Sequence, residues 1–348
     1  MESERLSELR DRVQYNCHIS DARHGSEYGL CTYLMKMREF FRWEMGLGFA
    51  DTLAQSEVGD WLSDRESLWA ELGGAEFQPL AIDGREYDPF DARAINQVLA
   101  DHGLVYSGGL GYAGRPHFFL GELEHQGQRN GFSLLVSGRE LARDLTAPPA
   151  MTRDDVIFVR RESLRRMLWE KLESWRWNRP QNALGRAFSC YDFERDLDGS
   201  LELMTDSELE LVLLHEEGEC RAGAWLGTQW NEMLRELEHT PAELGARAVR
   251  DHLADCTVTL PSLLDMERSS SIHFYIGNLT PMRRELFPRL RWAYDQWLES
   301  GNPETIRDTS EQGRDHWQSV AREMLALHSR HGPEAAAPIR ELMEQCKL

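Results

Sequence analysis

Residues 16–31 read Asn16-Cys-His-Ile-Ser-Asp-Ala-Arg-His-Gly-Ser-Glu-Tyr-Gly-Leu-Cys31 and lie inside a long helical pattern at the start of the chain. Positions at steps of three or four residues form one stripe on an unbroken helix. Asp21 and His24 interrupt an otherwise largely apolar stripe, and a buried carboxylate or imidazole needs a polar partner or a metal ion. The stretch therefore predicts a buried polar site on an N-terminal helix. The whole stripe consists of Leu6, Leu9, Val13, Cys17, Asp21, His24, Tyr28, Cys31 and Met35.

Two glycines make a single unbroken helix less favourable. Gly25 and Gly29 lie four residues apart within the pattern, and each costs a helix about 1 kcal/mol relative to alanine. They predict either close approach of another backbone or a break near Ser20, which would give two helices in place of one.

Asp21, His24 and Glu27 follow one another at i, i+3 steps, so on one helix they can converge on one ion or on two adjacent ions. Helical bundles that hold two iron or manganese ions use a carboxylate and a histidine with this spacing. The alternative interpretation is a network of buried polar side chains without a metal.

A second cluster contains His215 and Glu219, an i, i+4 pair that can bind one ion or form a buried ion pair. His252 and Asp255 form a third cluster. If 206–238 and 241–256 form a helical hairpin, the two histidines are offset by about 18 Å, at about 1.5 Å per residue. Only one of these clusters can then meet the first helix. We favour His215 and Glu219, although a helix shortened or kinked at Gly223 or Gly227 would reopen the choice.

The distribution of helix and strand patterns predicts a mainly α fold, a helical bundle with a small inserted α+β segment. We expect N-terminal helices in 1–74, the α+β segment in 75–160 and a helical domain in 161–348. Within the α+β segment, 117–123 and 132–136 are expected to form a hairpin, and 145–153 a linker.

Two helix starts and one loop stand out. Thr205 with Glu208, and Thr240 with Glu243, match the capping box that begins a helix. The glycine-rich residues 107–116 have dinucleotide-binding spacing, but a strand pattern follows them where that motif needs a helix. A loop over a pocket, with His117 nearby, is the better interpretation.

Composition limits the class of partner. The chain has 348 residues, 41% hydrophobic and 28% charged, with a formal net charge of −20 at pH 7. Phosphates would be repelled over most of this acidic surface, so we expect neither nucleic acid nor an anionic membrane as a partner. The N-terminus lacks the apolar core of a secretory signal, and the six cysteines are scattered, so we expect a cytoplasmic protein with reduced thiols.

The stretch from Asn16 to Glu44, NCHISDARHGSEYGLCTYLMKMREFFRWE, resembles the opening of an uncharacterised family of bacterial proteins, a resemblance that implies no activity. The overall plan is also similar to ferritin-like and haem-oxygenase-like bundles, which carry a dinuclear iron centre. This sequence differs from them in lacking a pair of ExxH motifs and in its α+β segment.

The leading hypothesis is a helical metalloprotein with a mononuclear or dinuclear iron or manganese site; zinc fits the same donors, and haem on one histidine is a further alternative. It would act on a small-molecule substrate by oxidation with dioxygen or by metal-assisted hydrolysis, with Tyr28 as a redox or hydrogen-bonding neighbour. The metal ligands would be Asp21, His24, Glu27, His215 and Glu219.

Two hypotheses compete with it. One is a non-enzymatic interaction or assembly protein, whose histidines satisfy a polar core and whose acidic surface docks a basic protein partner. The other is a single cysteine that reacts beside His24.

Overall fold

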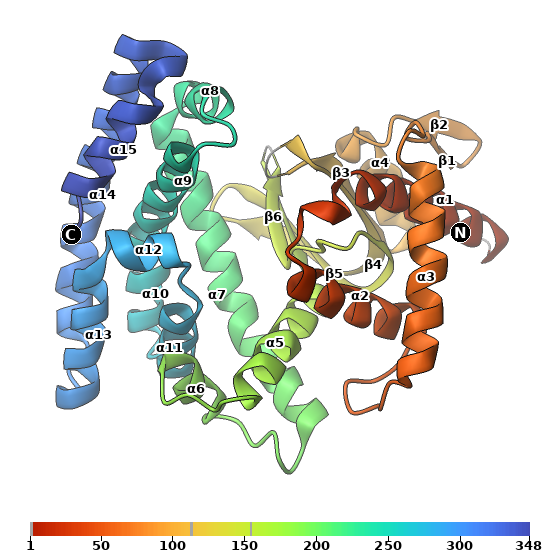
Figure 1. The fold of residues 1–348 in the computed structure, drawn as a ribbon, viewed down its shortest axis with the longest axis horizontal. Coiled ribbons are helices and arrows are strands. Elements are labelled where there is room, and N and C mark those ends of the chain that lie inside the picture. The colour runs from red at the N-terminus through yellow and green to blue at the C-terminus, as the bar shows by residue number, and fades with distance from the viewer. Residues whose placement is uncertain (1–2, 112–113, 154) are drawn as a thin grey trace. The chain divides into compact units, whose positions relative to one another are not determined.

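The computed structural model describes residues 3–111, 114–153 and 155–348 (Figure 1). Most of these residues are helical, and an α+β part is inserted among the helices, so the predicted fold class is confirmed. The chain forms two compact units. Unit 1 comprises Met1–Ser174 and Glu194–Thr205, and unit 2 comprises Trp175–Phe193 and Asp206–Leu348.

The central helix of unit 1 is α1 (Ser3–His24). Its residues 16–21 are all buried, so this part of the helix is covered on every side. α3 (Gln55–Leu72) packs along it and ends before Gly73. The stretch that the sequence singled out therefore lies at the centre of unit 1.

The single N-terminal stripe ends early. A 3-10 turn, Gly25–Glu27, follows α1, and α2 (Leu30–Glu44) begins after Gly29. The expected break near Ser20 is therefore wrong in position, since Ser20 lies inside α1. The stripe is also wrong beyond this turn, because Cys31 and Met35 are exposed on α2.

A five-stranded sheet forms the second layer of unit 1, in the order β3-β4-β5-β7-β6. β5 and β7 are parallel and the other neighbours antiparallel. The predicted hairpin is confirmed as β4 and β5, which are longer than expected and turn at Asn130-Gly131, where both residues have positive φ. The strands are β3 (Leu104–Leu110), β4 (Pro116–Arg129), β5 (Phe132–Arg143), β6 (Ala150–Arg153) and β7 (Val156–Arg160).

One face of this sheet packs against α1. Leu9, Val13 and Cys17 of the helix contact a buried apolar cluster that includes Tyr106, Phe118 and Leu120 of the strands. This packing fixes the rotation of α1 and so brings Asp21, one turn after Cys17, to the end of β5. α4 (Ala92–Leu99) and a two-stranded ladder of β1 (Leu80–Ile82) and β2 (Arg85–Tyr87) complete the cluster.

The sheet curls so that its two edge strands approach each other (Figure 1). Ser107 on β3 donates a hydrogen bond to the sulfur of Met151 on β6 at 3.4 Å, and Arg153 on β6 donates one to the Gly108 carbonyl on β3. The prediction of a linker over 145–153 is therefore wrong, because β6 belongs to the sheet.

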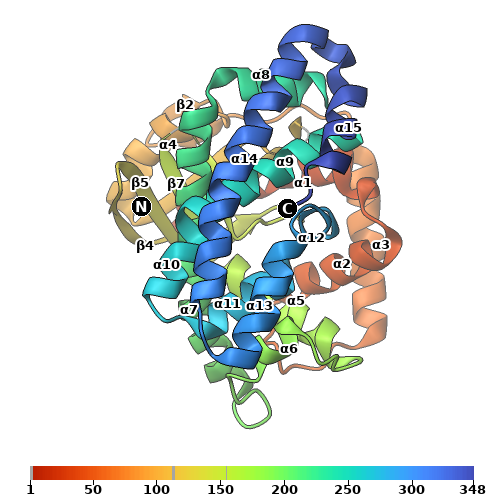
Figure 2. The same cartoon turned by 90° about the vertical axis from the view of Figure 1, so that its left-hand side faces the viewer.

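Unit 2 is helical. Figure 2 shows α14 beside α13, and α14 also packs against α9. The helices are α6 (Ala183–Phe188), the later part of α7 (Leu197–Leu226), α8 (Thr228–Glu236), α9 (Pro241–Ala254), α10 (Leu260–Asp265), α11 (Ser269–Asn278), α12 (Pro281–Leu286), α13 (Pro288–Ser300), α14 (Glu304–His331) and α15 (Ala336–Gln345); α5 (Arg161–Arg176) leads into the unit.

The expected helix over 206–238 is divided. It ends at Leu226, and Gly227 adopts a φ of 73° before α8 begins. The hairpin offset that separated His215 from the third cluster therefore does not apply. α7 and α9 pack closely, since a Cβ at Gly218 would stand 2.6 Å from the Ala254 carbonyl oxygen.

Of the two predicted capping boxes, only the second begins a helix. The Thr240 hydroxyl accepts a hydrogen bond from the Glu243 N–H, and the Glu243 carboxylate accepts one from the His239 N–H. Thr205 lies inside α7 and donates to the Leu201 carbonyl at 2.6 Å. Glu208 is therefore not a cap but a buried side chain, which accepts a hydrogen bond from Ser271 at 3.1 Å.

We expect Glu208→Gln to stabilise unit 2 increasingly as the pH rises from about 5 to 8. Burial raises the pKa of Glu208 to about 8, outweighing the Ser271 hydrogen bond and the Arg268 charge. Between about 4.3 and this value the folded protein retains a proton that the unfolded chain releases, so stability falls by up to about 1.4 kcal/mol per pH unit. The Glu208→Gln variant has no group that titrates at this position, so its stability does not fall for this reason.

Urea unfolding at several pH values measures the effect, with the exposed Glu232→Gln as the control. A stability difference between the Glu208 variant and the natural chain that does not change with pH would contradict the assignment.

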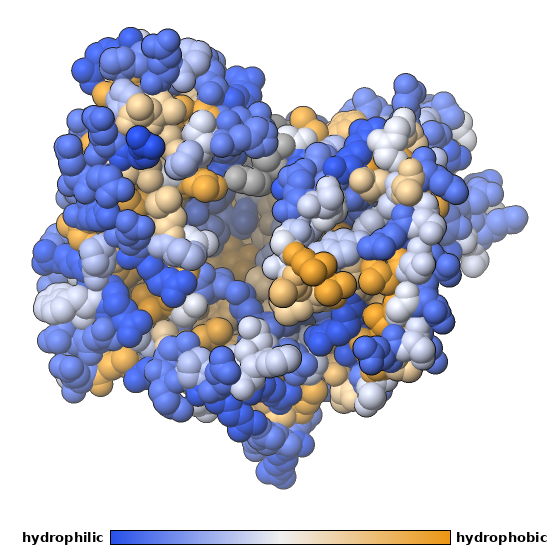
Figure 3. Space-filling view, in the orientation of Figure 1, coloured by the Kyte–Doolittle hydropathy of each residue, from blue (hydrophilic) through white to orange (hydrophobic). Residues whose placement is uncertain are grey.

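The visible surface is mostly hydrophilic (Figure 3), as the high content of charged residues requires. Among the described residues, no helix combines the length and apolarity needed to span a bilayer.

Candidate functional site

The turn after β5, residues 144–147, collects polar side chains from three other elements. The Leu145 N–H donates a hydrogen bond to Asp21 of α1 at 2.9 Å. His117, at the start of β4, contacts Asp144 through Nδ1 at 3.1 Å. The Tyr28 hydroxyl lies 2.8 Å from that of Thr146. This turn is the centre of the candidate site.

Asp144 is an ionised carboxylate within the turn. It is almost fully buried and accepts hydrogen bonds from the N–H groups of Phe118 and Ala147 at 3.2 and 2.6 Å. Burial alone would raise its pKa, but the hydrogen bond and charge of His117, the charge of Arg160 and the Ala147 N–H together hold the pKa below its usual range. Ala147 has a positive φ of 39°, a strained conformation that closes this turn.

The pKa of Asp21 is shifted in the opposite direction. Burial, and then the negative charge of Asp144, raise its pKa well above the ordinary range, against the Leu145 N–H and the charges of Arg143 and Arg65. Its Oδ2 atom is buried and has no hydrogen-bond partner among the described residues. Two neighbouring carboxyl groups with pKa values driven apart are typical of acid–base sites.

A pocket of about 420 Å³ opens beside Asp21, and we refer to it as the Asp21 pocket. Tyr28, Tyr33 and Trp69 give it aromatic walls, and Glu66 stands at its exposed rim. The Tyr33 hydroxyl donates a hydrogen bond to Glu66 at 3.0 Å, which fixes one wall. Concave, mostly apolar sites with a few polar groups are typical of small-molecule binding.

His24 and Glu27 lie apart from this buried centre. His24 Nδ1 contacts Glu27 Oε1 at 2.7 Å, and Glu27 also pairs with Arg115. The His24 hydrogen bond and the Arg115 charge lower the pKa of Glu27. The two residues therefore form a partly exposed ion-pair cluster, whereas Asp21 points into the interior.

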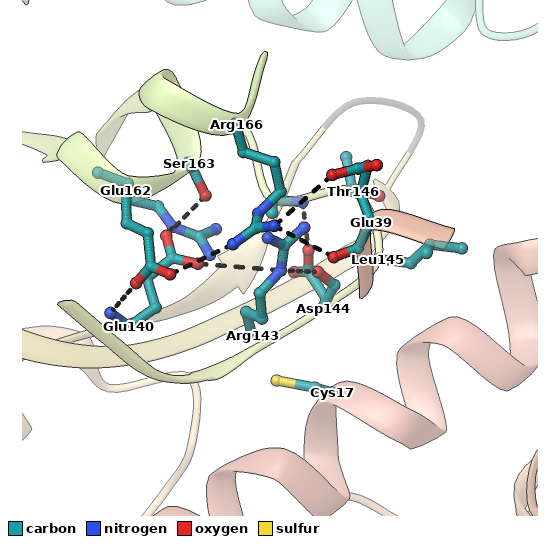
Figure 4. Close-up of polar contacts among 12 residues, drawn as sticks. Cys17, Glu39, Glu140, Arg143, Asp144, Leu145, Thr146, Glu162, Ser163 and Arg166 are labelled. Atoms are coloured by element: carbon teal, nitrogen blue, oxygen red, sulfur yellow. Dashed lines mark hydrogen bonds and ion pairs between the residues drawn. The ribbon is translucent and has the colours of Figure 1, made fainter. Parts of the chain in front are cut away.

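A network of buried ion pairs lies beside this turn (Figure 4). Glu140 accepts hydrogen bonds from Arg160 Nε at 2.7 Å and from the Ser163 hydroxyl at 2.6 Å. Arg166 lies 3.3 Å from Glu162 and donates to the Glu39 carbonyl at 3.2 Å. Charges this deeply buried hold one another in fixed positions, because any of them left unpaired would be costly.

Unit 2 contains the other predicted residues, around a π-helical turn at Asp255–Thr259 that continues α9. Asp255 is fully buried and lies 2.7 Å from His215 Nδ1, while Glu219 is 3.5 Å from His215 Nε2. Arg283 pairs with the second oxygen of Asp255. The structure thus brings His215, Glu219 and Asp255 into one network, although the sequence treated them as alternatives.

His252 does not join this network through its side chain. Its Nε2 lies 2.9 Å from the Arg283 carbonyl oxygen, and its ring stacks on Trp317 with centroids 5.1 Å apart. Burial lowers its pKa to about 3, so His252 is a neutral core residue.

Cys17 is not a reactive thiol in this structure. It is fully buried, its sulfur donates to the Phe118 carbonyl at 3.3 Å, and burial raises its pKa well above the usual range. A thiol held in this way is a poor nucleophile.

The described residues contain no group of three or more His, Cys, Asp or Glu side chains arranged to hold a metal ion. Asp21 is bound to a backbone N–H, His24 to Glu27, and His215 to Asp255. Each of these donors already has a partner within the protein, which the ligands of the expected metal centre would not have. A bound iron, manganese or haem stays a prediction. The joint site of α1 with His215 and Glu219 also stays a prediction, since the two sets of residues belong to different units.

Comparison with protein families assigns the chain to a group. The model of the C-terminal domain of a family of unknown function (DUF6866) matches residues 165–346, and that of its N-terminal domain matches residues 8–160. The chain belongs to the DUF6866 family. The resemblance to an uncharacterised family is confirmed, and the likeness to ferritin-like and haem-oxygenase-like bundles stays a prediction. No curated protein and no solved structure matches the chain.

The DUF6866 N-terminal domain covers the turn, Asp21 and the Asp21 pocket. It also spans most of the first two predicted domains, 1–74 and 75–160, which unit 1 likewise contains together. The predicted three-part division itself stays a prediction.

Proposed function

We propose that the Asp21 pocket binds a flat aromatic or heteroaromatic molecule and that Asp21 donates a proton to one of its oxygen or nitrogen atoms. The observation that carries this proposal is that Asp21 lines a pocket of about 420 Å³ while its buried Oδ2 has no hydrogen-bond partner among the described residues. A neutral carboxyl group that lines a mostly apolar pocket can act as a general acid, because the pocket keeps its proton from being lost to water.

The neighbours of Asp21 suit this role. Aromatic walls favour a planar ligand, and the acidic rim at Glu66 disfavours an anionic one, so the ligand is uncharged or cationic. The negative charge of Asp144 disfavours ionised Asp21, so after donating its proton Asp21 readily takes one back. Asp144 thus acts on Asp21 through its negative charge. The hydrogen bond and charge of His117 help to keep Asp144 ionised by lowering its pKa.

A screen of small aromatic compounds by ligand-observed NMR tests the pocket. Ala70 lines the pocket from the exposed side of α3, so we expect Ala70→Trp to weaken binding at least about tenfold by filling the space. Ser67→Trp is the matched control, because Ser67 is also exposed on α3 and does not line the pocket. Equal binding by both variants would place the ligand elsewhere.

Asp21→Asn tests the proton transfer separately. We expect bound compounds with an acid-labile C–O or C–N bond to be hydrolysed by the natural chain, with the Asp21 proton taken by the leaving oxygen or nitrogen, water bonding to the carbon, and a proton of that water returning to Asp21. The variant should do this about 100-fold more slowly, the lower end of what a general acid contributes. Mass spectrometry of the products measures the rate. Conversion at the same rate by both proteins would refute the role of Asp21 while leaving binding intact.

A further inference from the structure

Unit 1 contains a second pocket, of about 390 Å³, between α4 and the curled sheet. Its apolar lining comes mainly from four strands, and it shares no residue with the Asp21 pocket. The mouth of a curled sheet is a common place for a small-molecule site. The apolar lining includes Leu104, Leu123, Leu135, Val156 and Phe158.

Arg153 lines this pocket at the seam where the two edge strands meet. Its guanidinium lies across β3, where a Cβ at Gly109 would overlap it, so the glycine at 109 makes room for the charge. Among the described residues, Arg153 donates only to the Gly108 carbonyl and pairs with no carboxylate. Its remaining N–H groups are available to an anion.

The other charges around the pocket are already matched. Arg93 pairs with Asp155 at 2.5 Å. Asp91 caps α4 by accepting a hydrogen bond from the Ala94 N–H at 3.0 Å, where the helix dipole favours its charge. Among the described residues, Arg153 is therefore the charged side chain of this mostly apolar pocket that has no oppositely charged partner.

We infer that this pocket, here named the Arg153 pocket, binds an apolar carboxylic acid, with the carboxylate on Arg153 and the apolar body on the inner face of the sheet. Guanidinium and carboxylate have matching geometry and form strong, charge-assisted hydrogen bonds. The volume suits a chain of about eight carbons or a fused pair of rings, judged against typical ligand sites of about 300–1,000 Å³.

Isothermal titration calorimetry with octanoate and 2-naphthoate tests the inference, and octanol tests the need for charge. We expect saturable binding of at least one acid, and binding of octanol at least tenfold weaker than that of octanoate. In Arg153→Gln the affinity for the acid should fall at least tenfold, since a hydrogen bond to a charged group is lost, while octanol is unaffected.

Two further variants make the result decisive. Leu135→Trp keeps Arg153 but fills the pocket, so it should abolish binding of acid and alcohol alike. Arg139→Gln is the matched control, because Arg139 is exposed on the same sheet and does not line the pocket. Thermal unfolding confirms that each variant is folded. The inference is overturned if neither acid binds, if octanol binds as tightly as octanoate, or if Arg153→Gln binds the acid unchanged.

Discussion

Replacing Arg160 with methionine will lower the free energy of unfolding of unit 1 by about 3–5 kcal/mol, the usual cost of orphaning one member of a buried ion pair. Arg160 is fully buried and donates to Glu140 at 2.7 Å, and its guanidinium also lies 4.4 Å from the centre of the Phe119 ring. Methionine fills much of the volume but, among the described residues, leaves the Glu140 carboxylate with only Arg143, at 3.8 Å, and the Ser163 hydroxyl as partners.

Urea unfolding followed by circular dichroism measures this loss. Arg139→Met on the same sheet is the control and should change stability by less than about 0.5 kcal/mol, because Arg139 is exposed. The double variant Arg160→Met, Glu140→Gln should recover part of the loss, since it removes both charges together. A single variant as stable as the natural chain would mean that the pair contributes nothing.

The second large effect is expected in unit 2. Asp255→Asn should cost about 3–5 kcal/mol near pH 5.5, because Asp255 is buried between Arg283 and His215 and also accepts hydrogen bonds from Thr259 at 2.8 Å and Tyr275 at 3.1 Å. Asparagine retains much of the shape but not the charge that these two cations require.

The cost should depend on pH in a defined direction. Burial opposes the charged form of His215, but Asp255 and Glu219 raise its pKa well above the usual range. The resulting stabilisation is complete below the unfolded pKa of about 6.5 and is lost as the pH rises through the folded pKa. The pKa of Asp255 is lowered, because the charges of Arg283 and His215 outweigh burial, so its contribution is lost as the pH falls below about 4.

The difference between the natural chain and Asp255→Asn should therefore be largest between about pH 4 and 6.5 and narrower at pH 9. Asp265→Asn is the control, because Asp265 is exposed in its pair with Arg307 and should contribute less than about 1 kcal/mol. A difference that grows above pH 6.5 would contradict the assignment of a charged His215.

Some of the structure could be predicted from the sequence because local patterns decide it. The burial of Asp21 follows from its place on the apolar stripe of α1, and the Asn130-Gly131 turn favours the β4–β5 hairpin. The division of the long helix at Gly227 was predicted only as an alternative, since a glycine inside a helical pattern can either be tolerated within the helix or mark its end.

The partners of Asp21 could not be predicted. Asp144 lies 123 positions later, and its place is set by the rotation of α1 on the sheet, a tertiary contact that no local pattern records. A weak signal existed: Asp144 precedes Pro148-Pro149 and accepts the Ala147 N–H, as aspartates in turns do. Tertiary contacts also decide the partner of His215. The sequence pattern pairs this histidine with the N-terminal helix, whereas in the structure it contacts Asp255, in the turn that continues α9.

The chain passes from one unit to the other at 174–175, 193–194 and 205–206, and the first and last of these crossings lie inside α5 and α7. A fragment ending at residue 160, where the match to the DUF6866 N-terminal domain stops, would lack α5 and the start of α7, which belong to unit 1. The boundary between the two matched domains therefore does not coincide with the boundary between the two units. Unfolding of α7 would break backbone hydrogen bonds in each unit, because part of this helix belongs to unit 1 and part to unit 2.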